Sequence, residues 1–213
     1  KPAGFNASNP NDNHYNWAKL DEAVNQAAAA GLRITMSVTG GGPVWTSQVP
    51  ARGSGLFKPN PAEYAQYATA IARRYGSKVD TYLIWNEPNQ PGWLQPQSNC
   101  KGSACTPEAP HIYRKLALAG YPAIKAVDPS AKVLIGMLAP IGSEGTKPNG
   151  ALKPMPFLRA MGCVDDNFRR VRTGSCRGFK APAGDSFGYH PYPKNRPPGR
   201  PNPDTESAQM SDL

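Results

Sequence analysis

The chain has 213 residues, 39% hydrophobic and 18% charged, which is enough apolar content for a packed core and excludes wholesale disorder. No apolar run approaches the roughly 18 residues of a membrane-spanning helix, so we expect no membrane partner. The net charge is +9, and residues 151–200 carry ten Lys or Arg against three Asp. Because this segment shows neither zinc-finger spacing nor basic residues alternating with aromatics, we expect a solvated basic surface and no nucleic-acid partner.

The first half of the chain predicts two helix–strand units. A helix over residues 14–30 has an apolar stripe and ends at Gly31, and a strand over 33–38 follows. A second helix begins at the N-cap Asn60 and closes at Gly76, and a strand over 79–85 follows it.

The second half repeats this order. A helix over 109–127, which we expect Pro122 to kink, precedes a strand over 132–138. A short helix over 155–161 precedes a strand over 185–189, and a last helix is predicted to begin near Pro203.

Helix followed by strand, four times over, predicts an α/β fold of parallel βα units. A doubly wound sheet usually has a glycine-rich phosphate loop after its first strand, and residues 40–43 lack that spacing. In a (β/α)8 barrel the chemistry gathers at the carboxyl ends of the strands. Polar and aromatic residues follow three of the predicted strands here, which favours part of such a barrel.

Four cysteines occur in loop-like stretches, and the simplest pairing joins Cys100 to Cys105 and Cys163 to Cys176. Four free buried thiols are the alternative. No CxxC occurs and the histidines lie far away in sequence, so we expect no metal site. Two disulfides indicate an oxidising compartment, and because the sequence starts at Lys1 without Met, we expect a secreted protein whose targeting segment has been removed.

Glu87 directly follows a predicted buried apolar strand, which places a carboxylate at the carboxyl end of that strand, where the opening of a barrel lies. Pro88 restricts Glu87 to extended geometry. Apolar neighbours such as Trp85 are expected to raise the pKa of this carboxyl, which suits a general acid near neutral pH. The alternative is a glutamate that only caps a loop.

Residues 84–89, Ile-Trp-Asn-Glu-Pro-Asn, resemble the signature that ends the fourth barrel strand of glycoside hydrolase clan A. The stretches 17–45, 113–140 and 187–192 resemble the third strand region, the fifth strand region and the His-x-Tyr end of the sixth. The nearest families are family 39 and the related family 5, many of whose members cleave β-linked glycans. The resemblance implies that residues 1–213 form one partial TIM-barrel catalytic domain, covering about strands three to six.

The resemblance also implies roles for single residues. Glu87 matches the acid/base, Asn86 the residue that binds the hydroxyl beside the reacting carbon, and Tyr192 the tyrosine that hydrogen-bonds the nucleophile. His190 matches a site-lining histidine, with a structural histidine as the alternative. Loop aromatics stack on sugar rings or serve as hydrophobic plugs, and the two candidates are Trp45 and Trp93.

A retaining enzyme needs a second carboxylate, which in this clan ends the seventh strand. Glu144 comes nearest, but it follows the wrong strand. We therefore expect a retaining β-glycoside hydrolase whose nucleophile lies outside this chain, acting on an oligo- or polysaccharide without a cofactor. A non-catalytic carbohydrate-binding protein of the same fold is the alternative, and a nucleotide-binding domain is a more distant third.

Overall fold

The computed structural model describes residues 1–143, 145–193, 197, 199–200 and 202–210. Its centre is a parallel sheet of four strands in the order β1-β2-β5-β6. All four lie where the sequence predicted strands, with ends that differ by one residue at most: Ile34–Val38, Val79–Ile84, Lys132–Leu138 and Ser186–Tyr189. The fold is therefore a mixed α/β fold, as predicted.

Four α-helices accompany the sheet: α1 (Ala18–Ala29), α2 (Pro61–Tyr75), α3 (Ala109–Lys125) and α4 (Pro154–Met161). The side chain of Asn60 accepts a hydrogen bond from the Ala62 amide at 2.9 Å, so the predicted N-cap of α2 is confirmed. Pro122 lies inside α3, and the helix continues past it to Lys125.

One helix prediction was wrong at its start, and another was wrong for the described residues as a whole. The helix expected from His14 begins at Ala18, because Asp12 accepts hydrogen bonds from the Asn6 and His14 amides and holds the preceding residues in turns. The helix expected from Pro203 does not form in the described residues, where 203–207 run as bends and turns. Asp204 accepts from the Glu206 amide and the Ser207 hydroxyl, which favours a turn over a helix.

A hairpin that the sequence analysis treated as loop lies beside the main sheet. Its strands are β3 (Ser98–Lys101) and β4 (Ala104–Pro107), and they pair antiparallel with Cys100 directly opposite Cys105. The turn between them contains Gly102 at φ +60°, a conformation that glycine adopts without a Cβ clash. Short 3-10 turns complete the fold: η1 (Val44–Thr46), η2 (Pro50–Arg52) and η3 (Gly174–Cys176).

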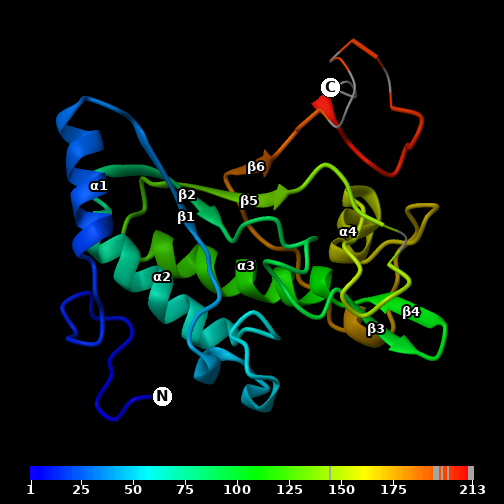
Figure 1. The fold of residues 1–213 in the computed structure, drawn as a ribbon, viewed down its shortest axis with the longest axis horizontal. Helices are drawn as coiled ribbons and strands as arrows, with labels where there is room; N and C mark the ends of the chain where they lie inside the picture. The colour runs from blue at the N-terminus through cyan, green and yellow to red at the C-terminus, as the bar shows by residue number, and fades with distance from the viewer. Residues whose placement is uncertain (144, 194–196, 198, 201, 211–213) are drawn as a thin grey trace.

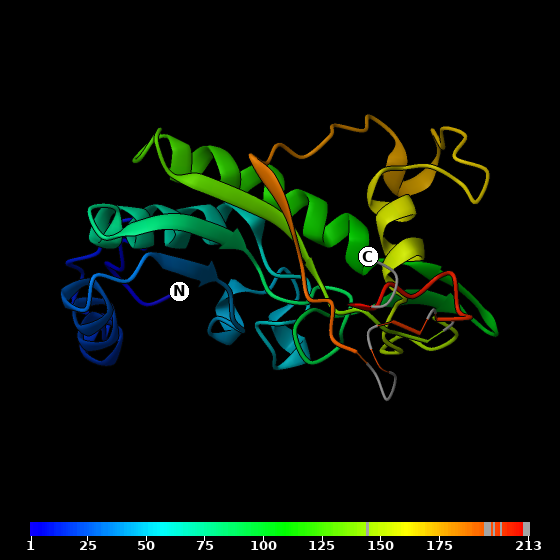
Figure 2. The same cartoon turned by 90° about the horizontal axis from the view of Figure 1, so that it is seen from above.

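The helices α2 and α3 lie on the same face of the sheet, as the two ribbon views agree (Figures 1 and 2). The strands follow one another across the sheet in chain order without a reversal, so the described part lacks the switch point of a doubly wound sheet. Within the described residues the sheet is not closed into a barrel, because β1 and β6 each pair on one side only.

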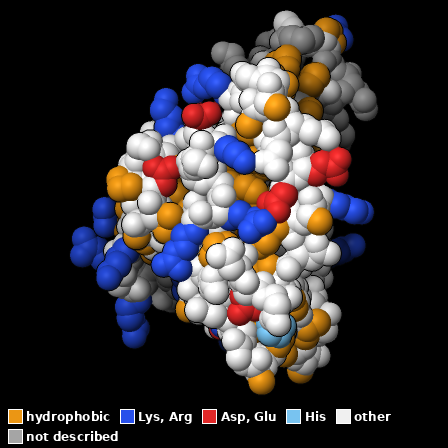
Figure 3. Space-filling model, turned by 90° about the vertical axis from the view of Figure 1, so that its left-hand side faces the viewer, with side chains coloured by type: hydrophobic (Ala, Val, Ile, Leu, Met, Phe, Trp, Pro, Cys, Tyr) orange, Lys and Arg blue, Asp and Glu red, His pale blue; other side chains and the backbone are white. Residues whose placement is uncertain are grey.

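The core fills the space between this helical layer and the sheet. Its largest fully buried side chains include Tyr82, Tyr113, Ile84 and Leu116. On the side of the molecule that carries α1, Lys and Arg side chains spread over the surface (Figure 3). Of the described helices, none is both long enough and apolar enough to cross a membrane.

Candidate functional site

The backbone is unusual where β2 and β5 end. Trp85 and Glu87 have φ of +66° and +38°, and Met137 has φ of +50°, all in the left-handed region that non-glycine residues rarely enter. The expectation that Pro88 holds Glu87 in extended geometry was therefore wrong, because the chain turns here and the Glu87 carbonyl accepts from the Gln90 amide at 2.9 Å. The Glu87 amide donates to the Met137 carbonyl at 2.8 Å. Met137 lies at an irregularity between Gly136 and Leu138 in the pairing of β5 with β6. Such bulges redirect side chains at the ends of strands, and this one adjoins Glu87.

Tyr113 of α3 explains how the two strands separate. The ladder between β2 and β5 ends at the pair Leu83–Leu134. Beyond it the Tyr113 hydroxyl donates to the Ile84 carbonyl at 3.2 Å and accepts from the Gly136 amide at 2.6 Å. Burial raises the pKa of this hydroxyl well above its usual range, so it stays protonated and can make both bonds.

Asn89 ties the same region together from the loop after Glu87. Its side chain is fully buried and donates to the Ala139 carbonyl at 3.0 Å and the Leu152 carbonyl at 2.9 Å. Its Oδ1 accepts from the Ala139 amide at 2.9 Å. The sequence analysis gave Asn89 no role, although its place in the strand-end motif was the available signal. These bonds hold the loop that carries Glu87 against the end of β5.

Glu87 and His190 meet at the end of the sheet. The His190 Nδ1 lies 3.0 Å from Glu87 Oε1, and the two side chains are 22% and 21% exposed. The residues are 103 positions apart, and the His190 amide donates to the Leu138 carbonyl, which fixes the chain leaving β6. Tyr192 follows, 64% exposed, with its ring centroid 6.1 Å from that of His190. The structure thus places these three predicted site residues in one contiguous group.

The other predicted site residues flank this group. Asn86 is half-buried beside Glu87. Trp93 is 36% exposed, and its carbonyl accepts a hydrogen bond from the buried Trp85 indole at 3.0 Å. Trp45 is half-buried in the 3-10 turn after β1 and lines a cavity of about 330 Å³ to which Trp85 also contributes. Trp85 therefore links Trp93, through this hydrogen bond, with Trp45, through the cavity that both line.

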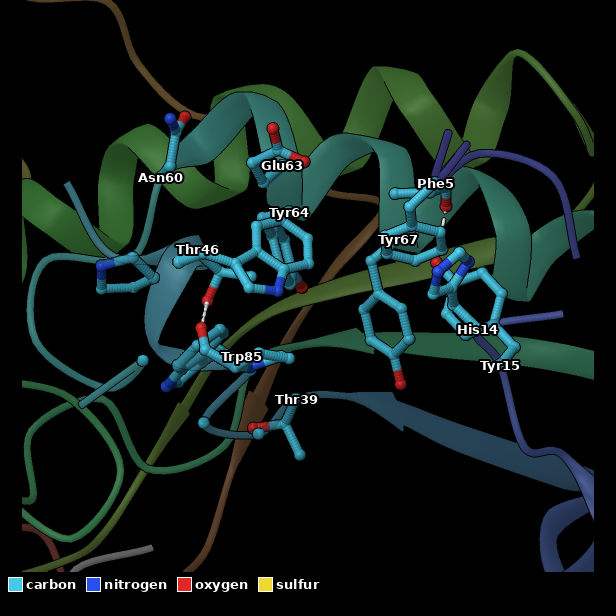
Figure 4. A pocket seen from close by; sticks show the side chains of 18 residues that line it. Phe5, His14, Tyr15, Thr39, Thr46, Asn60, Glu63, Tyr64, Tyr67 and Trp85 are labelled. Carbon is cyan, nitrogen blue, oxygen red and sulfur yellow. Dashed lines mark hydrogen bonds between the residues drawn. The ribbon is translucent and has the colours of Figure 1, made fainter. Parts of the chain in front are cut away.

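That cavity is a feature the sequence analysis missed (Figure 4). It lies between the segment 5–15, the loop after β1 and the first two turns of α2. Its aromatic walls come from residues far apart in the sequence: Phe5, Tyr15, Trp45, Tyr64, Tyr67 and Trp85. The available signal was the set of tyrosines in α2, Tyr64, Tyr67 and Tyr75, to which the sequence analysis gave no role.

Among the described residues, the other glutamates make contacts elsewhere. Glu63 pairs with Lys1, Glu108 with Lys58 and Glu206 with Arg159. Glu144, the nearest alternative by sequence, lies outside the described residues. The described chain therefore shows Glu87 with a histidine partner and with no carboxylate partner.

Both predicted disulfides are present, Cys100–Cys105 and Cys163–Cys176. The second pair lies beside His111, and these three residues form the one group of potential metal ligands in the described part of the chain. Because both sulfurs are in a disulfide, they are not thiolate ligands, and the group is structural. Arg114 of α3 anchors this loop by donating to the Met161 and Ser175 carbonyls.

The basic segment before β6 begins on this disulfide-closed loop and continues beyond Cys176. Its exposed cations are Arg169, Arg170, Arg172, Arg177 and Lys180. The loop contacts α3 through Arg114. The basic residues after His190 that were expected to border a substrate cleft fall mostly outside the described residues.

Neither a protein-family model nor a curated protein matches this chain. Fold and site define the protein as an α/β protein. Its parallel sheet carries α2 and α3 on one face, and a Glu–His pair lies at the carboxyl ends of its strands.

Proposed function

We propose that the chain is part of a retaining β-glycoside hydrolase of clan A, with Glu87 as its general acid/base. The observation that carries the proposal is the contact of Glu87 with His190 at the carboxyl edge of a parallel sheet, the edge that carries the chemistry in (β/α)8 barrels. The helices α2 and α3 lie on one face of the sheet, and the strands of the sheet stand in chain order. Both features fit four consecutive βα units of such a barrel.

In this proposal Glu87 protonates the leaving glycosidic oxygen and later removes a proton from the attacking water. His190 orients the carboxyl through its 3.0 Å contact, and Asn86 binds the hydroxyl next to the reacting carbon. Tyr192 hydrogen-bonds a nucleophilic carboxylate that a segment outside these residues supplies. Trp93 and Trp45 offer aromatic faces on which sugar rings stack.

The second candidate is a non-catalytic carbohydrate-binding protein of the same fold. It is favoured by the lack of a carboxylate partner for Glu87 among the described residues, since a fold does not guarantee an activity. A glutamate at the end of a seventh strand favours the enzyme, and Gln or Ala there favours the binder. In both cases we propose secretion, because the two disulfides suit an oxidising compartment.

The test is Glu87→Ala in the complete enzyme. We expect turnover of natural glycans to fall by about 10²–10⁴, the usual contribution of general acid–base catalysis. The loss is smaller for an aryl glycoside with an activated leaving group, because that group needs no protonation, and azide partly restores turnover of that substrate. The matched control is the exposed Glu22→Gln on α1. Equal losses on both substrates without rescue by azide remove Glu87 from this role.

A further inference from the structure

The cavity next to Trp45 has the properties of a binding site for a ring-shaped ligand. Its volume of about 330 Å³ and its aromatic walls suit a single small ring. In Figure 4, Tyr67 extends from α2 toward β1, and the side chains of Phe5 and Tyr15 close the end opposite Thr46. Aromatic faces of this kind pack on the apolar faces of saturated rings.

The hydroxyls around the cavity fall into two sets. The Tyr15 and Tyr64 hydroxyls donate to the Ala7 and Val38 carbonyls and are fully engaged as donors. The Tyr67 hydroxyl has no hydrogen-bond partner among the described residues, and Tyr67 lines the cavity. It is therefore available to a hydroxyl group of a ligand. The Thr39 Oγ1 also lacks a partner among these residues, but it is buried from the cavity space.

One rim of the cavity already holds a cation. The Lys1 Nζ lies 5.7 Å from the ring centroid of Phe5 and 5.6 Å from that of Trp45. It also lies 2.9 Å from Glu63 Oε2 and 3.2 Å from Gln66 Oε1. Two aromatic faces and a carboxylate around one ammonium form a cation-binding cage.

We propose that this cavity binds an amino-sugar unit with a free amine. The sugar ring lies between the aromatic walls, one of its hydroxyls bonds to Tyr67, and its ammonium takes the place of Lys1 Nζ between Phe5 and Glu63. The inference rests on the proposed function, since the unit belongs to the glycan that the site at Glu87 acts on. It names the substrate class as a β-linked glycan that carries unacetylated amino groups.

The experiment measures binding by titration calorimetry in a Glu87→Ala background, so that turnover does not interfere. The probes are three β-1,4-linked tetramers, of glucosamine, of N-acetylglucosamine and of glucose. We expect the glucosamine tetramer to bind at least about fivefold tighter than the other two, from the cation–π and ion-pair contacts of one ammonium. Equal affinities, or no binding of any tetramer, overturn the proposal.

Variants with matched controls test the cage itself. Glu63→Gln abolishes the preference for the amine, and Lys1→Met strengthens binding of the glucosamine tetramer because it removes the competing ammonium. The controls are the exposed Glu22→Gln and Lys19→Met, which leave the preference unchanged. Near-ultraviolet circular dichroism verifies that each variant folds. An unchanged preference in folded Glu63→Gln overturns the proposal.

The catalytic role of Glu87 and the binding of an amino sugar in the cavity are tested independently of each other. A loss of amine preference leaves the catalytic role of Glu87 in place, because the readout is binding. Failure of azide rescue at Glu87 leaves the calorimetric comparison of the three tetramers intact.

Discussion

The Tyr113 hydroxyl occupies the place where two backbone groups would otherwise pair across the sheet. It satisfies the Ile84 carbonyl and the Gly136 amide at once, in a fully buried position. A backbone group buried without a partner is destabilising by about 1–3 kcal/mol. The side chain of one helical residue therefore sets the spacing of β2 and β5 just before Glu87.

We expect Tyr113→Phe to lower the free energy of unfolding by about 1–3 kcal/mol, because it leaves both backbone groups unpaired. Urea unfolding followed by circular dichroism measures this. The matched control is Tyr192→Phe, whose ring is 64% exposed and which we expect to change stability by less than about 0.5 kcal/mol. Similar effects of the two substitutions contradict the bridging role of Tyr113.

At the scale of the elements, the first turn of α3 and the loop closed by Cys163–Cys176 pack around His111. Burial, with a contribution from the nearby charge of Arg114, lowers the pKa of His111 to about 4, against the opposing effect of Glu108. The unfolded chain binds a proton at this residue below about pH 6.5, whereas the folded chain does not until about pH 4. Stability from this residue is therefore present above pH 6.5 and is lost as the pH falls toward 4.

We expect the free energy of unfolding to fall between pH 6.5 and 4 by about 1–2 kcal/mol on account of His111, less than the full pKa shift corresponds to, because solvent screens the partly exposed imidazole. His111→Gln removes this part of the pH dependence, which urea unfolding at a series of pH values measures. The control is the exposed Lys19→Gln, which removes no group that titrates in this range and keeps the slope of the parent protein. A parent-like slope in His111→Gln contradicts the assignment.

The elements that could be predicted are those encoded in short, local patterns. The run 132–138 is apolar and bounded by turn residues, and it forms β5 with the predicted bounds. The hairpin of β3 and β4 was missed because its arms, such as Ser98–Lys101, contain few apolar or β-branched residues. The disulfide and the glycine turn hold it together instead.

The candidate site was predictable at the strand ends and not beyond. Glu87 and His190 follow strands, and parallel strands bring their carboxyl ends to one edge. Tyr67 could not be assigned to a cavity, because aromatic residues at helical spacing have the same pattern whether they fill a core or line a pocket. Phe5 lies outside the helices and strands, so no periodic pattern marked it. The position of Tyr113 in a predicted helix likewise contained no information on what its hydroxyl bonds.

At the scale of the whole molecule, the sheet has one covered face and two open edges. Within the described residues β1 and β6 lack outer neighbours, and Phe187 of β6 is 49% exposed. Open edges and exposed apolar side chains promote association between chains. The positive net charge of +9 opposes association by repulsion, and salt screens that repulsion.

We expect a polypeptide limited to residues 1–213 to self-associate increasingly with added salt and to show no turnover of an activated aryl β-glycoside. Sedimentation velocity at several salt concentrations measures the first, and an assay against a Glu87→Gln control measures the second. A monomer with a cooperative melt and turnover that depends on Glu87, with retained anomeric configuration, contradicts both expectations. It also directs attention to a second carboxylate within these residues, with Glu144 the first to substitute.

The left-handed backbone at Glu87 has a consequence for the heat resistance of the protein. Glycine and asparagine adopt φ near +38° more readily than glutamate does, so either is favoured there on stability grounds alone. Under the proposed function, stability and chemistry therefore make opposite demands on this position. We expect Glu87→Gly and Glu87→Asn to raise the melting temperature while abolishing the proposed turnover. A melting temperature that stays the same or falls in both variants contradicts a strained backbone at Glu87.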